Sequence, residues 1–159
     1  MEENLHPSAY KVQQAVLDLG FNFRIVEFSE TTRTSADAAA AIGCTVGQIA
    51  KTLVFQTVDS QKPILIIASG SNRVNEKTIE AILGEPIKKA NAEFVRAATG
   101  FAIGGIPPVG HPSPITTFID QDLLTYSEVW AAAGTPNAVF PLPPEGLIKM
   151  TGGKVVSIK

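Results

Sequence analysis

Two strand-like segments joined by a short polar turn constrain the fold of this chain more than any other feature. Residues 51–58 and 63–69 are rich in β-branched and apolar side chains, and residues 59–62 between them have the composition of a turn. This pattern predicts a β-hairpin, which we place at the centre of a sheet.

Short helices and short strands alternate irregularly along the rest of the chain. Apolar spacing and capping residues predict helices over residues 8–19, 34–43, 75–83, 91–100, 127–133 and 144–150, with one further helical turn from residue 45. Alternating or β-branched segments predict strands over residues 21–28, 87–90, 116–120, 138–142 and 154–158. We therefore expect an α+β fold with a mixed, barrel-like sheet surrounded by short helices. The length of 159 residues fits one domain, residues 1–159.

The charge balance excludes a protein that attracts nucleic acid through an overall basic field, because the net charge is −2. Any contact with a polyanion must be local. The candidate positive positions are Arg33, Arg73 with Lys77, Lys88 with Lys89, and Arg96.

The location expected is the cytoplasm. Residues 1–7 are acidic and polar, unlike a secretory signal, and the longest apolar runs are too short to span a bilayer. Cys44 is the lone cysteine, which excludes an internal disulfide and fits a reducing compartment.

Metal, cofactor and covalent chemistry find little support in the sequence. His6 and His111 are the whole histidine complement and show no ligand spacing, so we expect no metal site. Neither a Rossmann nor a P-loop motif occurs, and no cofactor is expected. Cys44 lies at a helix end without a histidine nearby in sequence, which favours a small buried hydrophobe over a nucleophile.

Residues 100–111 form a segment rich in glycine and proline. Gly104 and Gly105 can take positive φ angles and admit a ligand against the peptide plane, whereas Pro107 and Pro108 lock φ. Exposed amides of such a loop can hold a carbonyl group or an anion. The alternative is a connection that only needs tight turns.

Lys51 stands where a helical turn precedes a strand, and alternation places it on the same face as Leu53 and Phe55. If that face points inward, the ammonium group can meet a phosphate, a carboxylate or a ribose hydroxyl. In the alternative, Thr52 and Val54 point inward and Lys51 is solvated. His111 has the same two options, a ligand contact or a solvated loop position.

Residues 34–37 leading through 49–54, then the loop of residues 100–111, then residues 118–120, together resemble the YbaK/ProX family of aminoacyl-tRNA deacylases. These are freestanding relatives of the editing domain of bacterial prolyl-tRNA synthetase. The resemblance covers nearly the whole chain. It implies an α+β fold around a mixed barrel, hydrolysis of a wrong amino acid from tRNA, and no metal.

Carried over residue by residue, the resemblance assigns the functional lysine to Lys51 and the family's G-x-x-x-P loop to residues 104–108. We expect Lys51, Gly104 and Gly105 to carry the chemistry. The expected substrate contacts are Thr34, Ser69, Ile106, Pro107, Pro108, His111 and Asp120. Pro107 and Ala132 replace a small polar residue and a serine that are usual in the YbaK-like branch.

The expected function is hydrolysis of the ester of a mischarged small amino acid, namely serine, threonine, alanine or cysteine, on tRNA for proline. Mischarged aminoacyl-tRNA is the expected partner, with prolyl-tRNA synthetase as a second one. Amides of the loop would polarise the carbonyl group, and no general base is assigned. The alternative is a non-catalytic module that binds aminoacyl-tRNA or a nucleotide.

Overall fold

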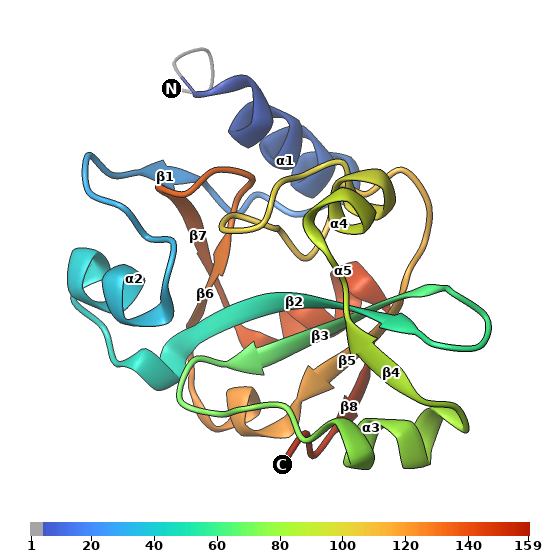
Figure 1. Ribbon diagram of the computed structural model, residues 1–159. Coiled ribbons are helices and arrows are strands. Elements are labelled where there is room, and N and C mark those ends of the chain that lie inside the picture. Colours follow the sequence, from blue (N-terminus) through green and yellow to red (C-terminus); the bar gives the residue numbers. More distant parts are fainter. Residues whose placement is uncertain (1–4) are drawn as a thin grey trace.

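The computed structural model describes residues 5–159 and contains one eight-stranded sheet with helices around it (Figure 1). Residues 1–4, part of the segment expected to lack a secretory signal, lie outside the described residues. The strands are β1 (Val26–Glu27), β2 (Ile49–Thr57), β3 (Pro63–Ser69), β4 (Ile87–Lys89), β5 (Thr116–Asp120), β6 (Val129–Ala132), β7 (Ala138–Leu142) and β8 (Lys154–Val156). The helices are α1 (Pro7–Asp18), α2 (Ser35–Ile42), α3 (Glu76–Leu83), α4 (Ala92–Thr99) and α5 (Pro144–Thr151), with the 3-10 turns η2 (Val46–Gln48) and η3 (Gln121–Thr125). Within residues 5–159, no helix is long and apolar enough to cross a membrane.

The hairpin of β2 and β3 lies at the centre of the sheet, as predicted. The strand order is β1-β7-β6-β2-β3-β5-β8, and β4 pairs with β2 beside this path. β2 runs antiparallel to β3 and β4 but parallel to β6, and β5 runs parallel to both β3 and β8. The predicted α+β class with a mixed sheet is confirmed, whereas closure of this sheet into a barrel stays a prediction.

Capping side chains position the helices around the sheet. Thr34 Oγ1 accepts a hydrogen bond from the Asp37 amide at 3.0 Å at the start of α2. Asn91 Oδ1 accepts one from an amide in the first turn of α4 at 2.8 Å. Gly43 and Gly100 end these two helices in the left-handed conformation. These boundaries agree with the predicted ones because a cap depends on only a few neighbouring residues.

Two clusters of buried side chains hold the loop of residues 100–111 against the sheet. Phe101 and Val109, near the two ends of the loop, belong to the largest cluster together with residues of α1, β6 and β7. Ile106, in the middle of the loop, packs with Val54 of β2 and with α4 in a separate cluster. The loop is therefore anchored near both ends and at its middle.

The helix predicted over residues 127–133 is wrong, because this segment forms strand β6. Val129 and Ala131 are each 0% exposed, whereas Trp130 and Ala132 are half-buried, which is the two-residue period of a strand. β6 lies between β2 and β7 and pairs with both. Burial between two neighbouring strands overrides the preference of alanine for helices.

The strand predicted over residues 21–28 is also wrong over most of its length, since only β1 pairs, with β7. The segment before β1 has no strand beside it and bonds to a side chain instead. Gln13 of α1 donates to the Phe23 carbonyl at 2.9 Å and accepts from the Ile25 amide at 3.1 Å. The alternation in this segment reflects packing: Phe21 and Phe23 stack with ring centroids 5.2 Å apart beside the largest core cluster.

Candidate functional site

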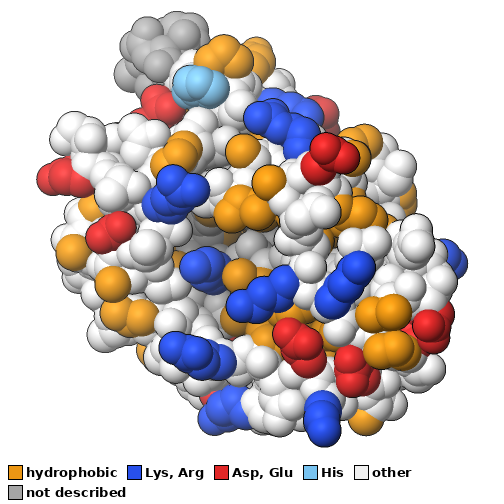
Figure 2. Space-filling model, viewed as in Figure 1, with side chains coloured by type: hydrophobic (Ala, Val, Ile, Leu, Met, Phe, Trp, Pro, Cys, Tyr) orange, Lys and Arg blue, Asp and Glu red, His pale blue; other side chains and the backbone are white. Residues whose placement is uncertain are grey.

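A cavity of about 660 Å³ lies between β2, the start of α2 and the loop of residues 103–106. The segment after β3 and side chains from β4, α4, β6 and β7 complete its lining. Lys and Arg side chains gather over the centre of this face, in front of β2 (Figure 2). The volume lies in the range of about 300–1,000 Å³ that is typical of small-molecule sites.

The cavity brings together six of the ten predicted site residues. These are Thr34, Lys51, Ser69, Gly104, Gly105 and Ile106. The other four, Pro107, Pro108, His111 and Asp120, do not line it.

β2 supplies the cavity wall with residues from both of its faces. Lys51 lines the cavity together with Leu53 and Phe55, the residues with which it alternates. Thr52 and Val54, on the opposite face of the strand, also line it. Lys51 is exposed, so it is both accessible to solvent and part of the cavity lining.

Cations dominate the charged lining of the cavity. The charged lining consists of one carboxylate, Glu76, and four cations, Arg33, Lys51, Arg73 and Lys89. This excess of positive charge contrasts with the net charge of −2 of the whole chain. The fold therefore gathers three of the scattered positive positions around Lys51. Such a lining attracts phosphate and carboxylate groups. Among the described residues, no three His, Cys, Asp or Glu side chains gather in a metal-binding arrangement.

The two neighbouring glycines of the loop allow two close approaches. Gly104 has a φ of +109°, and a Cβ there would lie 2.9 Å from Nε of Arg33, so the Arg33 side chain passes over this glycine. A Cβ at Gly105 would lie 2.6 Å from the carbonyl carbon and oxygen of Thr135. The Gly105 carbonyl also accepts a hydrogen bond from the Gly134 amide at 2.8 Å. A side chain at Gly105 would force the loop away from residues 134–135.

Two residues of the loop that line the cavity have amides that are unpaired among the described residues. Within residues 5–159, the amides of Gly104 and Ile106 donate no hydrogen bond, although both residues line the cavity. Preorganised amide donors of this kind stabilise a carbonyl oxygen or an oxyanion.

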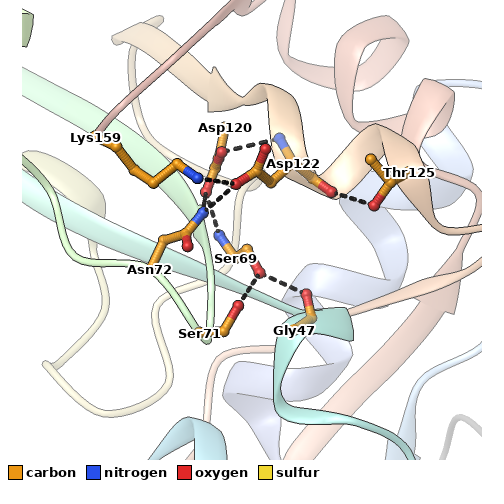
Figure 3. Close-up of polar contacts among 8 residues, drawn as sticks. All are labelled: Gly47, Ser69, Ser71, Asn72, Asp120, Asp122, Thr125 and Lys159. Carbon is orange, nitrogen blue, oxygen red and sulfur yellow. Dashed lines mark hydrogen bonds and ion pairs between the residues drawn. The ribbon is translucent and has the colours of Figure 1, made fainter.

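Asp120 orders the segment that follows β3 (Figure 3). Its carboxylate accepts hydrogen bonds from the Ser69 amide at 3.0 Å and from Asn72 Nδ2 at 2.8 Å. Asn72 also donates to Asp122 at 2.8 Å, and Lys159 pairs with Asp122 at 3.1 Å. The hydrogen bond from Asn72 and the Lys159 ammonium lower the pKa of Asp122. Because Ser69 and Asn72 line the cavity, Asp120 supports the lining without belonging to it.

Two predicted substrate contacts already make structural hydrogen bonds. The Ser69 hydroxyl donates to the Gly47 carbonyl at 2.7 Å, so its proton is committed to the protein. The Thr34 hydroxyl accepts from the Asp37 amide at 3.0 Å, which leaves its own proton available to another acceptor.

His111 closes a turn outside the cavity. Its Nε2 bonds the Pro107 carbonyl at 2.9 Å, and because a carbonyl only accepts, Nε2 carries the proton. Burial lowers the pKa of His111, which favours the neutral ring. His111 and Pro108 line a second hollow of about 310 Å³.

Thr52 is one of several polar cavity residues that the sequence did not single out, with Thr32, Ser35 and Asn72. It is 5% exposed, and its Oγ1 is buried without a hydrogen-bond partner among the described residues. The available signal was a hydroxyl side chain between apolar residues on one face of a central strand.

The remaining candidates for chemistry lie elsewhere. Cys44 is partly buried against Ala38 and Ile49, and desolvation raises the pKa of its thiol. His6 Nδ1 accepts a hydrogen bond from the Ser8 amide at 3.1 Å at the start of α1. Neither residue lines the cavity.

Known proteins match this chain over most of its length. A family profile described as the aminoacyl-tRNA editing domain matches residues 29–150. Uncharacterized protein YwhH of Bacillus subtilis is 29% identical over 131 residues, which covers 82% of this chain and 83% of the relative. EbsC of Enterococcus faecalis, provisionally named a Cys-tRNA(Pro)/Cys-tRNA(Cys) deacylase, is 26% identical over 133 residues, with 82% and 80% coverage. A crystal structure provisionally described as a trans-editing enzyme for prolyl tRNA synthetase superposes with a TM-score of 0.93 at 45% identity, covering 98% of this chain and 99% of that one.

Proposed function

This chain belongs to the aminoacyl-tRNA editing domain family, and we propose that it hydrolyses the ester that joins a mischarged amino acid to tRNA. The observation that carries the proposal is the cavity lined by both Lys51 and the amide-bearing loop of residues 104–106. Four cations around this cavity suit the phosphates of a tRNA 3′ end, which the net charge of −2 would otherwise repel.

The proposed substrate is tRNA for proline that carries serine, threonine, alanine or cysteine. The provisional names of EbsC and of the superposed crystal structure support the choice of tRNA and of prolyl-tRNA synthetase as a partner. Ala132, which lines the cavity and replaces a serine that is usual in the YbaK-like branch, favours serine and threonine over cysteine.

The proposed mechanism relies on positioning more than on acid–base groups. Water attacks the carbonyl carbon of the ester, the bond from that carbon to the ribose oxygen breaks, and the ribose hydroxyl leaves with a proton. The amides of Gly104 and Ile106 stabilise the negative charge that develops on the carbonyl oxygen. Lys51 holds the terminal nucleotide or stabilises the same charge. An aminoacyl ester is already activated, so orientation of the water and the ester supplies much of the rate.

The same lining explains why a proline ester should be spared. Ile106 packs against Val54 and narrows the cavity beside the loop. A compact side chain with a primary amino group fits beside this wall more easily than a pyrrolidine ring does, and an editing site of this kind acts as a second sieve.

Deacylation rates test the proposal directly. We expect hydrolysis of tRNA for proline charged with serine, threonine, alanine or cysteine when the protein is present below the substrate concentration, and no hydrolysis of the proline ester. Protection of every mischarged ester would favour the non-catalytic binding module. Hydrolysis of the proline ester as fast as the others would refute an editing role.

A further inference from the structure

Thr52 has a buried hydroxyl group that the fold leaves without a partner. Its Oγ1 makes no hydrogen bond among residues 5–159, and the residue is 5% exposed on the cavity wall. Buried side-chain polar atoms are hydrogen-bonded in the large majority of cases, because leaving one unpaired destabilises the fold. A valine would fill the same volume without this penalty, so the hydroxyl calls for an explanation outside the fold.

The neighbours of Thr52 place its side chain near the glycine-rich loop. Ala50 and Val54 flank it on the same face of β2, since side chains alternate along a strand. Val54 packs with Ile106 of the loop, and Ala50 belongs to the cluster that contains Phe101. Thr52 is therefore a polar residue between two apolar ones, on the strand face that packs against the loop.

The charge of the cavity limits which group the hydroxyl can meet. The cavity lining has one carboxylate, Glu76, and four cationic side chains, Arg33, Lys51, Arg73 and Lys89. A cationic group on a ligand therefore gains little free energy of binding beside Thr52. A neutral hydroxyl on a ligand suffers no such repulsion and can both donate to and accept from Thr52. The staggered positions of the Thr52 hydroxyl lie about 120° apart around the Cα–Cβ bond, so the hydroxyl can change direction by rotation.

We propose that Thr52 is a specificity residue that hydrogen-bonds the side-chain hydroxyl of a seryl or threonyl ester in the cavity. The inference rests on the proposed deacylase function and names the group that selects among its substrates. A seryl ester pairs the Thr52 hydroxyl, whereas an alanyl ester leaves it unpaired. One buried, unpaired hydroxyl corresponds to a preference of about tenfold to a hundredfold for the seryl ester.

Thr52→Val and Thr52→Ser test this assignment. We expect the wild type to favour seryl-tRNA over alanyl-tRNA in kcat/KM by about tenfold or more. Thr52→Val removes the hydroxyl at nearly constant volume, and it should lower the serine-to-alanine ratio at least tenfold. Thr52→Ser retains the hydroxyl and should retain the ratio. The thermal midpoint of Thr52→Val should equal or exceed that of the wild type, because the valine leaves no unpaired group.

A binding measurement separates failure of the inference from failure of the proposed function. The probes are the 3′-amide analogues of seryl- and alanyl-adenosine, which cannot be hydrolysed as esters are. Preference for the seryl analogue that disappears in Thr52→Val supports the inference even if turnover is absent. An unchanged serine-to-alanine ratio in Thr52→Val, in both rate and binding, refutes the inference and leaves the deacylase proposal standing. Wild-type protein that hydrolyses no mischarged ester refutes the deacylase proposal alone.

Discussion

Gly105→Ala tests whether the position of the loop sets the rate. A Cβ at Gly105 would lie 2.6 Å from the carbonyl carbon and oxygen of Thr135, and 2.8 Å from its amide nitrogen. The three contacting atoms belong to the backbone, so no side chain can rotate out of the way. Gly105 does not have a positive φ, so no left-handed backbone strain adds to the clash.

The magnitude follows from the distance that the loop must move. The Cβ of an alanine at position 105 would start 2.6 Å from the Thr135 carbonyl group. The loop must shift by about 0.8 Å to restore an ordinary contact distance of about 3.4 Å between them. This shift also stretches the 2.8 Å hydrogen bond from the Gly134 amide to the Gly105 carbonyl. A misplacement of about 1 Å in an active site costs on the order of a hundredfold in rate. Overpacking costs about 1–3 kcal/mol of stability, which corresponds to a thermal midpoint lowered by about 2–12 °C.

The assay is single-turnover hydrolysis of seryl-tRNA, with the thermal midpoint measured in parallel. Gly84→Ala is the matched control, because a Cβ at Gly84 meets nothing within 4 Å and this glycine does not line the cavity. Its positive φ still makes the control destabilising, by about 1–2 kcal/mol, without moving the loop. A Gly105→Ala rate within about threefold of that of Gly84→Ala would refute the argument that the loop position controls the chemistry.

Three further predictions concern the side chains of Lys51 in the cavity and of His111 and Cys44 outside it. Lys51→Ala should lower the deacylation rate by about thirtyfold to a thousandfold, which corresponds to about 2–4 kcal/mol. The control is Lys62→Ala, because Lys62 is exposed and lies outside the cavity, and this variant should keep the wild-type rate. Equal rates for the two variants would remove Lys51 from the mechanism. Burial lowers the pKa of His111, so the unfolded chain binds a proton at this residue more readily than the folded chain, and the free energy of unfolding should fall as the pH drops below about 6.5. His111→Gln should weaken this pH dependence in thermal melts at pH 7.5 and 5.5. An identical pH dependence in the variant and the wild type would contradict the expectation. Cys44→Ser and added chelator should each leave deacylation largely unchanged, and inhibition by the chelator that one metal ion reverses would reopen a metal-dependent reaction.

Elements governed by local signals could be predicted from the sequence. Thr34 and Asn91 cap their helices through amides in the next turn, so a few residues contain the whole signal. The hairpin was equally accessible, because its two strands are adjacent in the chain. The alanines of segment 127–133 favour a helix, whereas one of the two strands that pair with it, β2, lies far away in the sequence.

The site residues that could be predicted are those whose residue type itself indicates a function. Residues that reach the site only through the tertiary fold could not be predicted. The glycines of residues 104–105 and Lys51 are recognisable from the sequence, and the structure places them on one cavity. The convergence of Arg33 and Lys89 on the same cavity depends on tertiary packing that no local pattern contains. The unpaired hydroxyl of Thr52 is a property of its surroundings and becomes visible only after every neighbour has been placed.

The contacts at one end of the sheet, where β1 pairs with β7, join an early segment of the chain to a late one. Asn137 Nδ2 donates to the Phe28 carbonyl, 109 residues earlier, and the Thr32 amide bonds the Pro136 carbonyl. The contacts that Phe28 and Thr32 make with these later residues therefore form only after residues 136–137 have been synthesised. Contacts between such distant residues form slowly, because loop closure must precede them. A nascent chain can pair β2 with β3 early, but its cavity rim gains these contacts only once residues 136–137 have been made.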